Sequence, residues 1–258
     1  MSTAAPRPAV GAIVLTMNDR PAGEPRALAS LLAQDGIDLD VVVVGNGVTP
    51  AHTPEDVRTV HLPENVGIPE GRNVGAAHVK GDLLFFFDND AVLPAGDVLA
   101  RLAADAQRPG TVTVMAEGVV MVRRSAFDLA GQWPGAFHLF HEGLDLAWRL
   151  WQHGYTGLYR PEIVVHHPAT HPARHAQFYR LTARNRVWLA RRTLPALLIP
   201  ANLATWALLT VWRVRGRDAW HATLTGLKEG LHTHPGTRSP ISWRTVARLT
   251  RAGRPPIF

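Results

Sequence analysis

Apolar runs alternate with helically spaced apolar positions over the first 90 residues. Four runs are rich in small, β-branched or aromatic residues and predict strands at 9–15, 40–44, 57–62 and 83–87. The apolar spacing of 27–32 and the small residues of 71–79 predict helices between them. Strands that alternate with helices predict an α/β domain with a mostly parallel sheet.

Polar clusters follow three of the four predicted strands. They are Thr16-Met17-Asn18-Asp19-Arg20, Gly45-Asn46-Gly47 and Asp88-Asn89-Asp90. In open sheets of this kind, ligands bind beyond the carboxyl ends of the strands, where the loops gather. The pattern therefore predicts a binding site built from these clusters.

Asp88 and Asp90 place two carboxylates directly after the buried run 83–87. Such a pair suits a hard divalent cation such as Mg²⁺ or Mn²⁺, which can neutralise a diphosphate leaving group. The alternative is a polar turn, in which Asn and Asp side chains form local hydrogen bonds.

A second charged group lies on the predicted helix 142–153. At 100° per residue, Asp145 and Arg149 fall on the same side as Glu142, whereas the apolar residues Leu144, Ala147, Trp148 and Trp151 cluster opposite. A solvated face with an Asp145–Arg149 pair, and a favourable first-turn charge at Glu142, would explain this pattern without catalysis.

Composition narrows the chemistry. The chain has no cysteine, which excludes disulfides and thiolate sites, and its 46% hydrophobic and 19% charged residues are typical of a globular protein. The apolar run 9–17 is too short to span a bilayer and lacks a cleavage pattern, so we interpret it as a strand and expect the catalytic part to be cytoplasmic.

The charge is divided unevenly along the chain. From His171 onward there are 15 Lys and Arg against 2 Asp and Glu, and before it 12 against 19. Arginines flank an uncharged stretch, Leu194 to Trp212, that contains Pro195 and Pro200. We favour a helix lying in an anionic membrane interface; a hairpin packed on the domain or in a homodimer, and a membrane span, are the alternatives. We expect no nucleic-acid partner, because the tryptophans do not interleave with the basic residues.

Six segments follow one another between Val10 and His167. They are V-L-T-M-N-D-R, V-V-V-V-G-N-G, N-V-G-I-P-E-G-R-N-V-G, G-D-L-L-F-F-F-D-N-D, V-V-M-V-R-R-S-A-F and H-E-G-L-D-L-A-W-R-L-W-Q-H-G-Y. Their order resembles that of glycosyltransferase family 2, inverting enzymes of the GT-A fold. One such motif is weak, but six in order and in the expected strand context form a strong signal.

The resemblance implies roles for matching residues. Asp90 would ligate the metal, Asp88 would contact the metal or the ribose, and Glu142 or Asp145 would be the base that deprotonates the acceptor. The nucleotide-sugar would be bound by residues from the strand ends and from the helix after the third strand: Thr16, Asn18, Arg20, Asn46, Arg72, Asn73 and Asp88. His166, with His167 next, would be a further metal ligand.

Two positions depart from the family's pattern. The Asp that commonly reads the nucleobase is Gly45 here, and the second acidic residue of E-D-x-D, often named as the base, is Gly143. Glu142 is therefore the preferred base and Asp145 the second choice.

Together these observations predict a GT-A catalytic domain at 9–170, after a flexible tail at 1–8 and before a basic, apolar helical extension at 171–258. The expected activity is inverting transfer from a nucleoside-diphosphate sugar to a glycan or lipid-linked acceptor in cell-surface synthesis, with Mg²⁺ or Mn²⁺, at the inner face of the plasma membrane. A nucleotidyltransferase and a non-catalytic scaffold of the same fold are the rival readings.

Overall fold

The chain forms two compact units, Met1–Gly135 with Tyr155–Ala169 and Ala136–Gly154 with Thr170–Phe258. We call them the sheet unit and the helical unit. The computed structural model describes residues 6–116, 119–168 and 176–257, with the side chains of 112–116 excepted. Most of the predicted tail and the start of the predicted extension thus lie outside the described residues.

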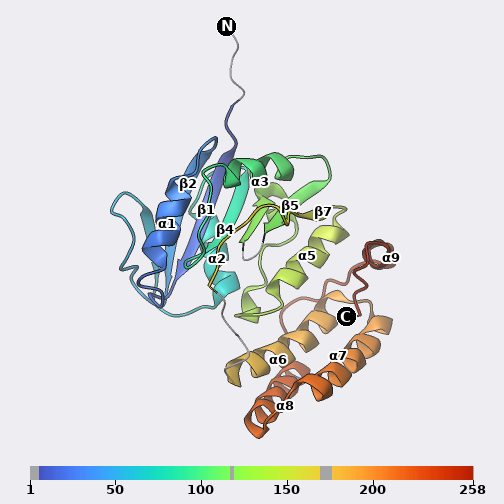
Figure 1. Cartoon of the computed structure of the whole chain (residues 1–258). Helices are drawn as coiled ribbons and strands as arrows, with labels where there is room; N and C mark the ends of the chain where they lie inside the picture. The colour runs from blue at the N-terminus through green and yellow to red at the C-terminus, as the bar shows by residue number, and fades with distance from the viewer. Residues whose placement is uncertain (1–5, 117–118, 169–175, 258) are drawn as a thin grey trace. The chain divides into compact units, whose positions relative to one another are not determined.

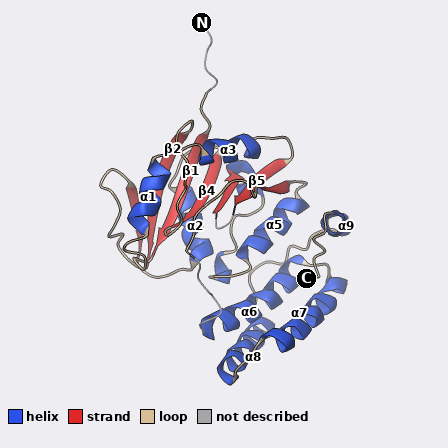
Figure 2. Cartoon of the chain, in the orientation of Figure 1, coloured by secondary structure: helices blue, strands red, loops and turns tan. Residues whose placement is uncertain are grey.

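A seven-stranded sheet in the order β3-β2-β1-β4-β6-β5-β7 forms the centre of the sheet unit (Figure 2). Its strands are β1 (Ala9–Thr16), β2 (Asp38–Asn46), β3 (Arg58–Leu62), β4 (Leu83–Asp88), β5 (Thr111–Ala116), β6 (Val119–Arg123) and β7 (Thr156–Tyr159). Pairing is parallel throughout except at β6, which runs antiparallel to β4 and β5. The four predicted strands are therefore confirmed as β1 to β4.

Helices cover both faces of this sheet (Figure 1). α1 (Glu24–Leu32) and α3 (Val98–Ala106) contribute to one core with Val10, Val43 and Phe85. On the other face, Phe127 of α4 (Arg124–Leu129) lies 5.5 Å from Phe86, ring centre to ring centre. Because side chains alternate along a strand, β1 and β4 serve both cores.

The helix α2 (Ile68–Ala77) approaches the same second face very closely. A Cβ atom at Gly71 would lie 2.5 Å from Leu15, and one at Gly75 would lie 2.3 Å from Ile13. The small residues that predicted this helix are therefore needed for its contact with β1. This contact brings the start of α2 to the carboxyl end of the sheet.

The helical unit consists of α5 (Glu142–Gln152), α6 (Ala176–Thr193), α7 (Ile199–Arg213), α8 (Arg217–His232) and α9 (Trp243–Arg251). Its core includes Phe137, Trp148, Trp188, Leu194 and Leu249. Figure 1 shows α6, α7 and α8 side by side.

One division differs from the predicted one. We expected α5 in the catalytic domain, but residues 136–154 group with the C-terminal helices. The physical reason is that the apolar face of α5 packs on α6 and α9, with Trp148 in their common core. The extension is thus the packing partner of the motif helix.

Candidate active site

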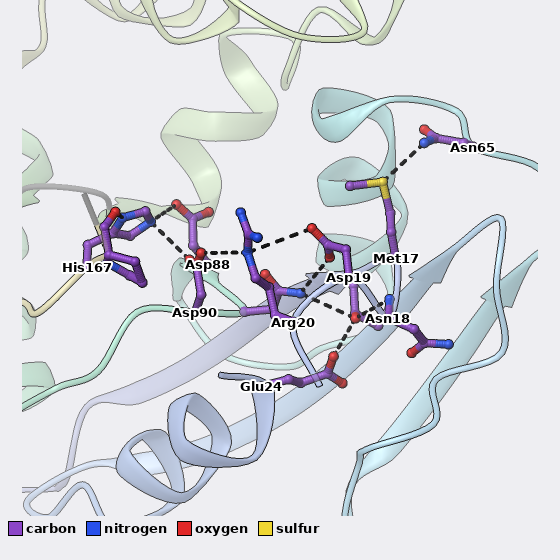
Figure 3. Close-up of polar contacts among 12 residues, drawn as sticks. Met17, Asn18, Asp19, Arg20, Glu24, Asn65, Asp88, Asp90 and His167 are labelled. Carbon is purple, nitrogen blue, oxygen red and sulfur yellow. Dashed lines mark hydrogen bonds and ion pairs between the residues drawn. The ribbon is translucent and has the colours of Figure 1, made fainter. Parts of the chain in front are cut away.

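Two carboxylates, one at the end of β4 and one just after it, contact the side chains of Arg20, Arg72 and His167. Figure 3 shows Arg20 and His167 beside Asp88 and Asp90. Arg72 donates to Asp88 Oδ1 at 2.7 Å, and Arg20 donates to Asp90 Oδ2 at 2.9 Å. The Nε2 atom of His167 lies 3.1 Å from Asp90 Oδ1 and 3.4 Å from Asp88 Oδ2. The two carboxylates therefore converge on one imidazole.

Each of these three side chains comes from a different part of the sheet unit. Arg20 follows β1, Arg72 lies on α2, and His167 follows a short antiparallel bridge between Val92 and His166. In extended backbone, neighbouring side chains point to opposite sides. The structure thus brings His167 to the carboxylates, whereas His166, the residue that we preferred, is exposed beside it.

The two carboxylates differ in exposure. The side chain of Asp90 is 8% exposed and that of Asp88 is 36% exposed. Among the residues that the structure describes, no three His, Asp or Glu side chains are arranged to hold a metal ion. The donors nevertheless suit Mg²⁺ or Mn²⁺, because two carboxylates and an imidazole share one point of contact.

A buried carboxylate that the sequence did not single out lies beneath this cluster. Glu24, in the first turn of α1, is fully buried and accepts a 2.5 Å hydrogen bond from the Thr16 hydroxyl. That hydroxyl oxygen accepts bonds from the backbone N–H of Asn18 and the side chain of Asn89. Glu24 thus holds Thr16 inside the loop network, where the sequence showed only an ordinary first-turn acid.

The loop after β2 explains why the usual aspartate is absent at position 45. A Cβ atom on Gly45 would lie 2.0 Å from the carbonyl oxygen of Val48, so the loop occupies the space of a side chain. Asn18 holds this loop, because it donates to Thr49 O at 2.9 Å and accepts from Ala51 N at 3.2 Å. The backbone of the loop therefore fills the position where the aspartate side chain would lie.

Two predicted binding residues are engaged in organising neighbouring loops. Asn46 is buried and bonds to Asn65 and to the backbone of Val66. Asn73 exchanges two hydrogen bonds with the backbone of Trp133. Trp133 itself is buried edge-on against Phe86 and Phe127, which makes it a core residue.

In the helical unit, Asp145 belongs to a buried ion-pair cluster. Arg149 donates to its Oδ2 atom at 2.7 Å, and Arg192 donates to its Oδ1 atom at 3.1 Å. The Asp145 side chain is 0% exposed. Both of its oxygens are thus bound by guanidinium groups, and the bond from Arg192 ties α5 to α6.

Glu142 begins α5 after a loop with unusual backbone. His138, Phe140 and His141 have φ angles of 65°, 70° and 67°, which non-glycine residues rarely adopt and which cost about 1–3 kcal/mol each. Fully buried Asn185 of α6 donates to the carbonyls of Phe137, Leu139 and Phe140 and so holds this loop. The strained loop before Glu142, held by hydrogen bonds from Asn185, therefore fixes where the first turn of α5 begins.

Beside Glu142, the pKa of His141 is lowered to about 4, first by burial and then by the charge of Arg186. Burial disfavours the charged imidazolium, and a nearby cation adds to this effect. His141 is therefore neutral at pH 7.

A comparison with protein families identifies the family of the chain. Residues 12–160 match the family described as Glycosyl transferase family 2, which is more than half of the chain. The chain belongs to glycosyltransferase family 2. The predicted family is confirmed, and the match includes the strand ends, the Asp88–Asp90 segment and the motif helix α5.

Solved structures confirm the GT-A fold. The mannosyltransferase PcManGT from Pyrobaculum calidifontis, solved with GDP-Man and Mn²⁺, has a TM-score of 0.58 at 18% identity, covering 97% of this chain and 77% of that chain. GalNAc-T7, solved with UDP, GalNAc and Mn²⁺, has a TM-score of 0.69 at 13% identity, covering 96% of this chain and 58% of that chain. A search of curated protein sequences gives no significant match.

Proposed function

We propose that this family 2 glycosyltransferase moves a sugar from a nucleoside-diphosphate sugar to an acceptor hydroxyl, with inversion and with Mg²⁺ or Mn²⁺. The observation that supports this most is the convergence of Asp88 and Asp90 on one point, with Arg20 and Arg72 beside them. Such a cluster offers carboxylates for a cation and guanidinium groups for a diphosphate.

Asp88, Asp90 and His167 are the side chains that would hold the cation. When bound, a divalent ion neutralises charge that develops on a diphosphate leaving group. In this proposal Arg72 and Arg20 turn from the carboxylates to the phosphate oxygens of the donor. Thr16, Asn18, Asn46 and Asn73 shape the nucleotide pocket through the loops that they hold.

Glu142 is the proposed base. An inverting transfer needs a carboxylate that accepts the proton of the acceptor hydroxyl as the hydroxyl attacks the anomeric carbon. Asp145 suits this role less, because both of its oxygens bind arginines and its side chain has no exposure. That Glu142 faces Asp90 across the sugar stays a prediction, since the two residues belong to different units.

The proposed site of action is the inner face of the plasma membrane, with a lipid-linked or other cell-surface acceptor. Ala196–Arg213 is long and apolar enough to cross a membrane by length and composition, and 6% of it is buried. It exposes Leu208 to 73% and Trp212 to 68%, and Arg213, Arg215 and Arg217 follow. Exposed apolar side chains beside arginines suit a helix lying in an anionic interface.

Nucleotide release tests the transfer. The full chain is incubated with GDP-, UDP- and dTDP-sugars and Mn²⁺, with and without chelator, and we expect release from one donor class that the chelator abolishes. Glu142→Gln should keep donor binding, measured by calorimetry, and lose transfer. Full activity in Glu142→Gln would move the base elsewhere, and failure of every donor to bind would favour a non-catalytic scaffold.

Flotation with vesicles that contain phosphatidylglycerol tests the membrane proposal separately. Leu208→Glu should reduce the floated fraction severalfold. Leu129→Glu is the matched control, because Leu129 is an exposed leucine of the sheet unit. Equal flotation of the Leu208→Glu variant and the wild type would contradict the proposed surface.

A further inference from the structure

A cavity of about 220 Å³ lies among α6, α7 and α8 within the helical unit. Its lining includes Arg186 from α6, Trp206, Thr210 and Arg213 from one face of α7, and Thr223 from α8. None of the catalytic roles proposed above uses this cavity. It therefore calls for an explanation of its own.

Two guanidinium groups border the cavity without an acidic partner among the described residues. Arg186 stacks on the ring of Trp206 at 3.9 Å and makes a long 3.4 Å hydrogen bond to Thr210. Its Nε atom is buried without a hydrogen-bond partner. Within the described part of the chain, neither Arg186 nor Arg213 forms an ion pair with Asp or Glu.

The charge of this arrangement is unfavourable in the absence of an anion. Burial, and then the neighbouring charge of Arg213, lower the pKa of Arg186 to about 10, so Arg186 remains cationic at pH 7. Two like charges beside a partly buried cavity repel each other, and a bound anion would remove this cost. Planar guanidinium groups bind phosphate oxygens well, often in pairs.

The rest of the lining is mainly apolar, with hydroxyl groups between. Phe178, Trp206, Leu209 and Val214 supply apolar walls. The hydroxyl of Thr182 is buried without a hydrogen-bond partner. A site with cations, a spare hydroxyl and apolar walls suits a ligand that combines an anionic group with an apolar chain.

The cavity is also related to the start of α5. Arg186 is close enough to His141 to lower the pKa of that imidazole, and His141 directly precedes Glu142. The base that we proposed thus begins its helix near the cationic side of the cavity. An acceptor held by Arg186 would lie in the same unit as Glu142.

We propose that Arg186 and Arg213 bind the phosphate or diphosphate group of an amphiphilic acceptor, whose apolar chain leaves along the α6–α7 walls. This inference rests on the proposed transferase function and gives its acceptor a chemical class. The shared chemistry is a phosphate ester on an apolar chain, free in solution or held in a bilayer.

Calorimetry of the full chain with octyl phosphate tests the site, with inorganic phosphate and octanol as the two half-ligands. We expect saturable 1:1 binding of octyl phosphate, and binding at least about tenfold weaker for either half-ligand. Arg186→Gln and Arg213→Gln should each weaken octyl phosphate binding about tenfold or more. Arg217→Gln, which removes the same charge outside the cavity lining, should not.

The outcomes separate the site from the proposed function. Equal weakening by Arg186→Gln and Arg217→Gln would show unspecific charge attraction and overturn the site, as would failure of the wild type to bind octyl phosphate. Arg213 is exposed, so Arg213→Gln remains informative if Arg186→Gln unfolds. Donor binding with Mn²⁺ should persist in the Arg186→Gln and Arg213→Gln variants. If the wild type binds no donor but still binds octyl phosphate, the transferase proposal fails while the phosphate site stands. Phosphatidylglycerol vesicles that compete with octyl phosphate would point to a bilayer source.

Discussion

Asp90 in the sheet unit and Asp145 in the helical unit each contact two basic residues, yet the surroundings of the two aspartates differ. Asp90 contacts Arg20 and His167, whose side chains are 43% and 27% exposed. Asp145 contacts Arg149 and Arg192, whose side chains are 7% and 17% exposed. The difference lies in the partners more than in the aspartates.

Accessibility of the partners separates a site that can exchange ligands from one that holds the fold. Arg20 and His167 can turn to water or to phosphate oxygens and leave Asp90 for a cation. Arg149 and Arg192 cannot leave without stranding a buried charge, which is strongly destabilising. The accessible cluster therefore suits the proposed binding of a cation, whereas the buried cluster holds α5 on α6.

Removal of the Asp90 carboxylate should have the largest effect on activity. Asp90→Asn removes a charge from the metal cluster, so we expect kcat/KM for donor turnover to fall roughly 10³-fold or more. The melting temperature should change little. A variant that retains wild-type turnover with Mn²⁺ would mean that the cluster is not the metal site.

Removal of the Asp145 carboxylate should instead lower the free energy of unfolding. Asp145→Asn leaves Arg149 and Arg192 without their buried partner, and we expect the free energy of unfolding to fall by about 3–5 kcal/mol in urea titrations. If Asp145→Asn is stable but inactive, Asp145 rather than Glu142 becomes the favoured base.

The imidazole of His141 in the helical unit should make the free energy of unfolding depend on pH. His141 has a pKa of about 4 in the folded chain, against 6.5 in the unfolded chain. Between these values the unfolded state binds a proton that the folded state does not, so stability falls as the pH is lowered from 6.5 to 4. We expect a loss of about 2–3 kcal/mol from this group, measured by urea unfolding.

The matched variant for this prediction is His141→Asn. Asparagine tolerates the left-handed backbone at this position and does not titrate. The free energy of unfolding of the wild type should therefore fall relative to that of the variant as the pH is lowered. Parallel pH profiles would exclude His141 as the cause.

The smallest effect is expected for Arg20, the exposed partner of Asp90. Arg20→Gln should change the free energy of unfolding by less than about 1 kcal/mol, because Arg20 is largely in solvent. Binding of Mn²⁺ alone should become tighter by a few fold, since a competing cation is gone. Weaker Mn²⁺ binding in this variant would contradict the competition between Arg20 and the ion.

The fold of the first half could be predicted because its signals are local. The runs at 9–15, 40–44 and 83–87 became β1, β2 and β4 within a few residues, and the carboxyl ends of these strands brought Asp88, Arg20 and Asn46 to one edge. The strands β5, β6 and β7 were missed. They have only four to six residues each, too few for a clear periodicity, and the pairing of β6 with β4 and of β7 with β5 joins segments far apart in the chain.

Residue type and strand position sufficed to predict that Asp88 and Asp90 lie together at the edge of the sheet, with Arg72 beside them. The site was not predicted where burial determines the role. The sequence analysis did not single out Glu24, and it expected Asp145 either on a solvated face with Arg149 or as a candidate base. Only the three-dimensional packing shows that both carboxylates are fully enclosed. The choice between His166 and His167 depended on one bridge to Val92, which sets the direction of each side chain.

The sequence by itself thus determined the family, the parallel sheet and the carboxylate pair at its edge, because these follow from periodicity and from the order of motifs. Tertiary structure alone decided which charged residues are accessible, which helix packs with which unit, and that Arg186 and Arg213 meet at a cavity. Such features depend on segments far apart in the chain, and the free energy of a charge depends on what surrounds it.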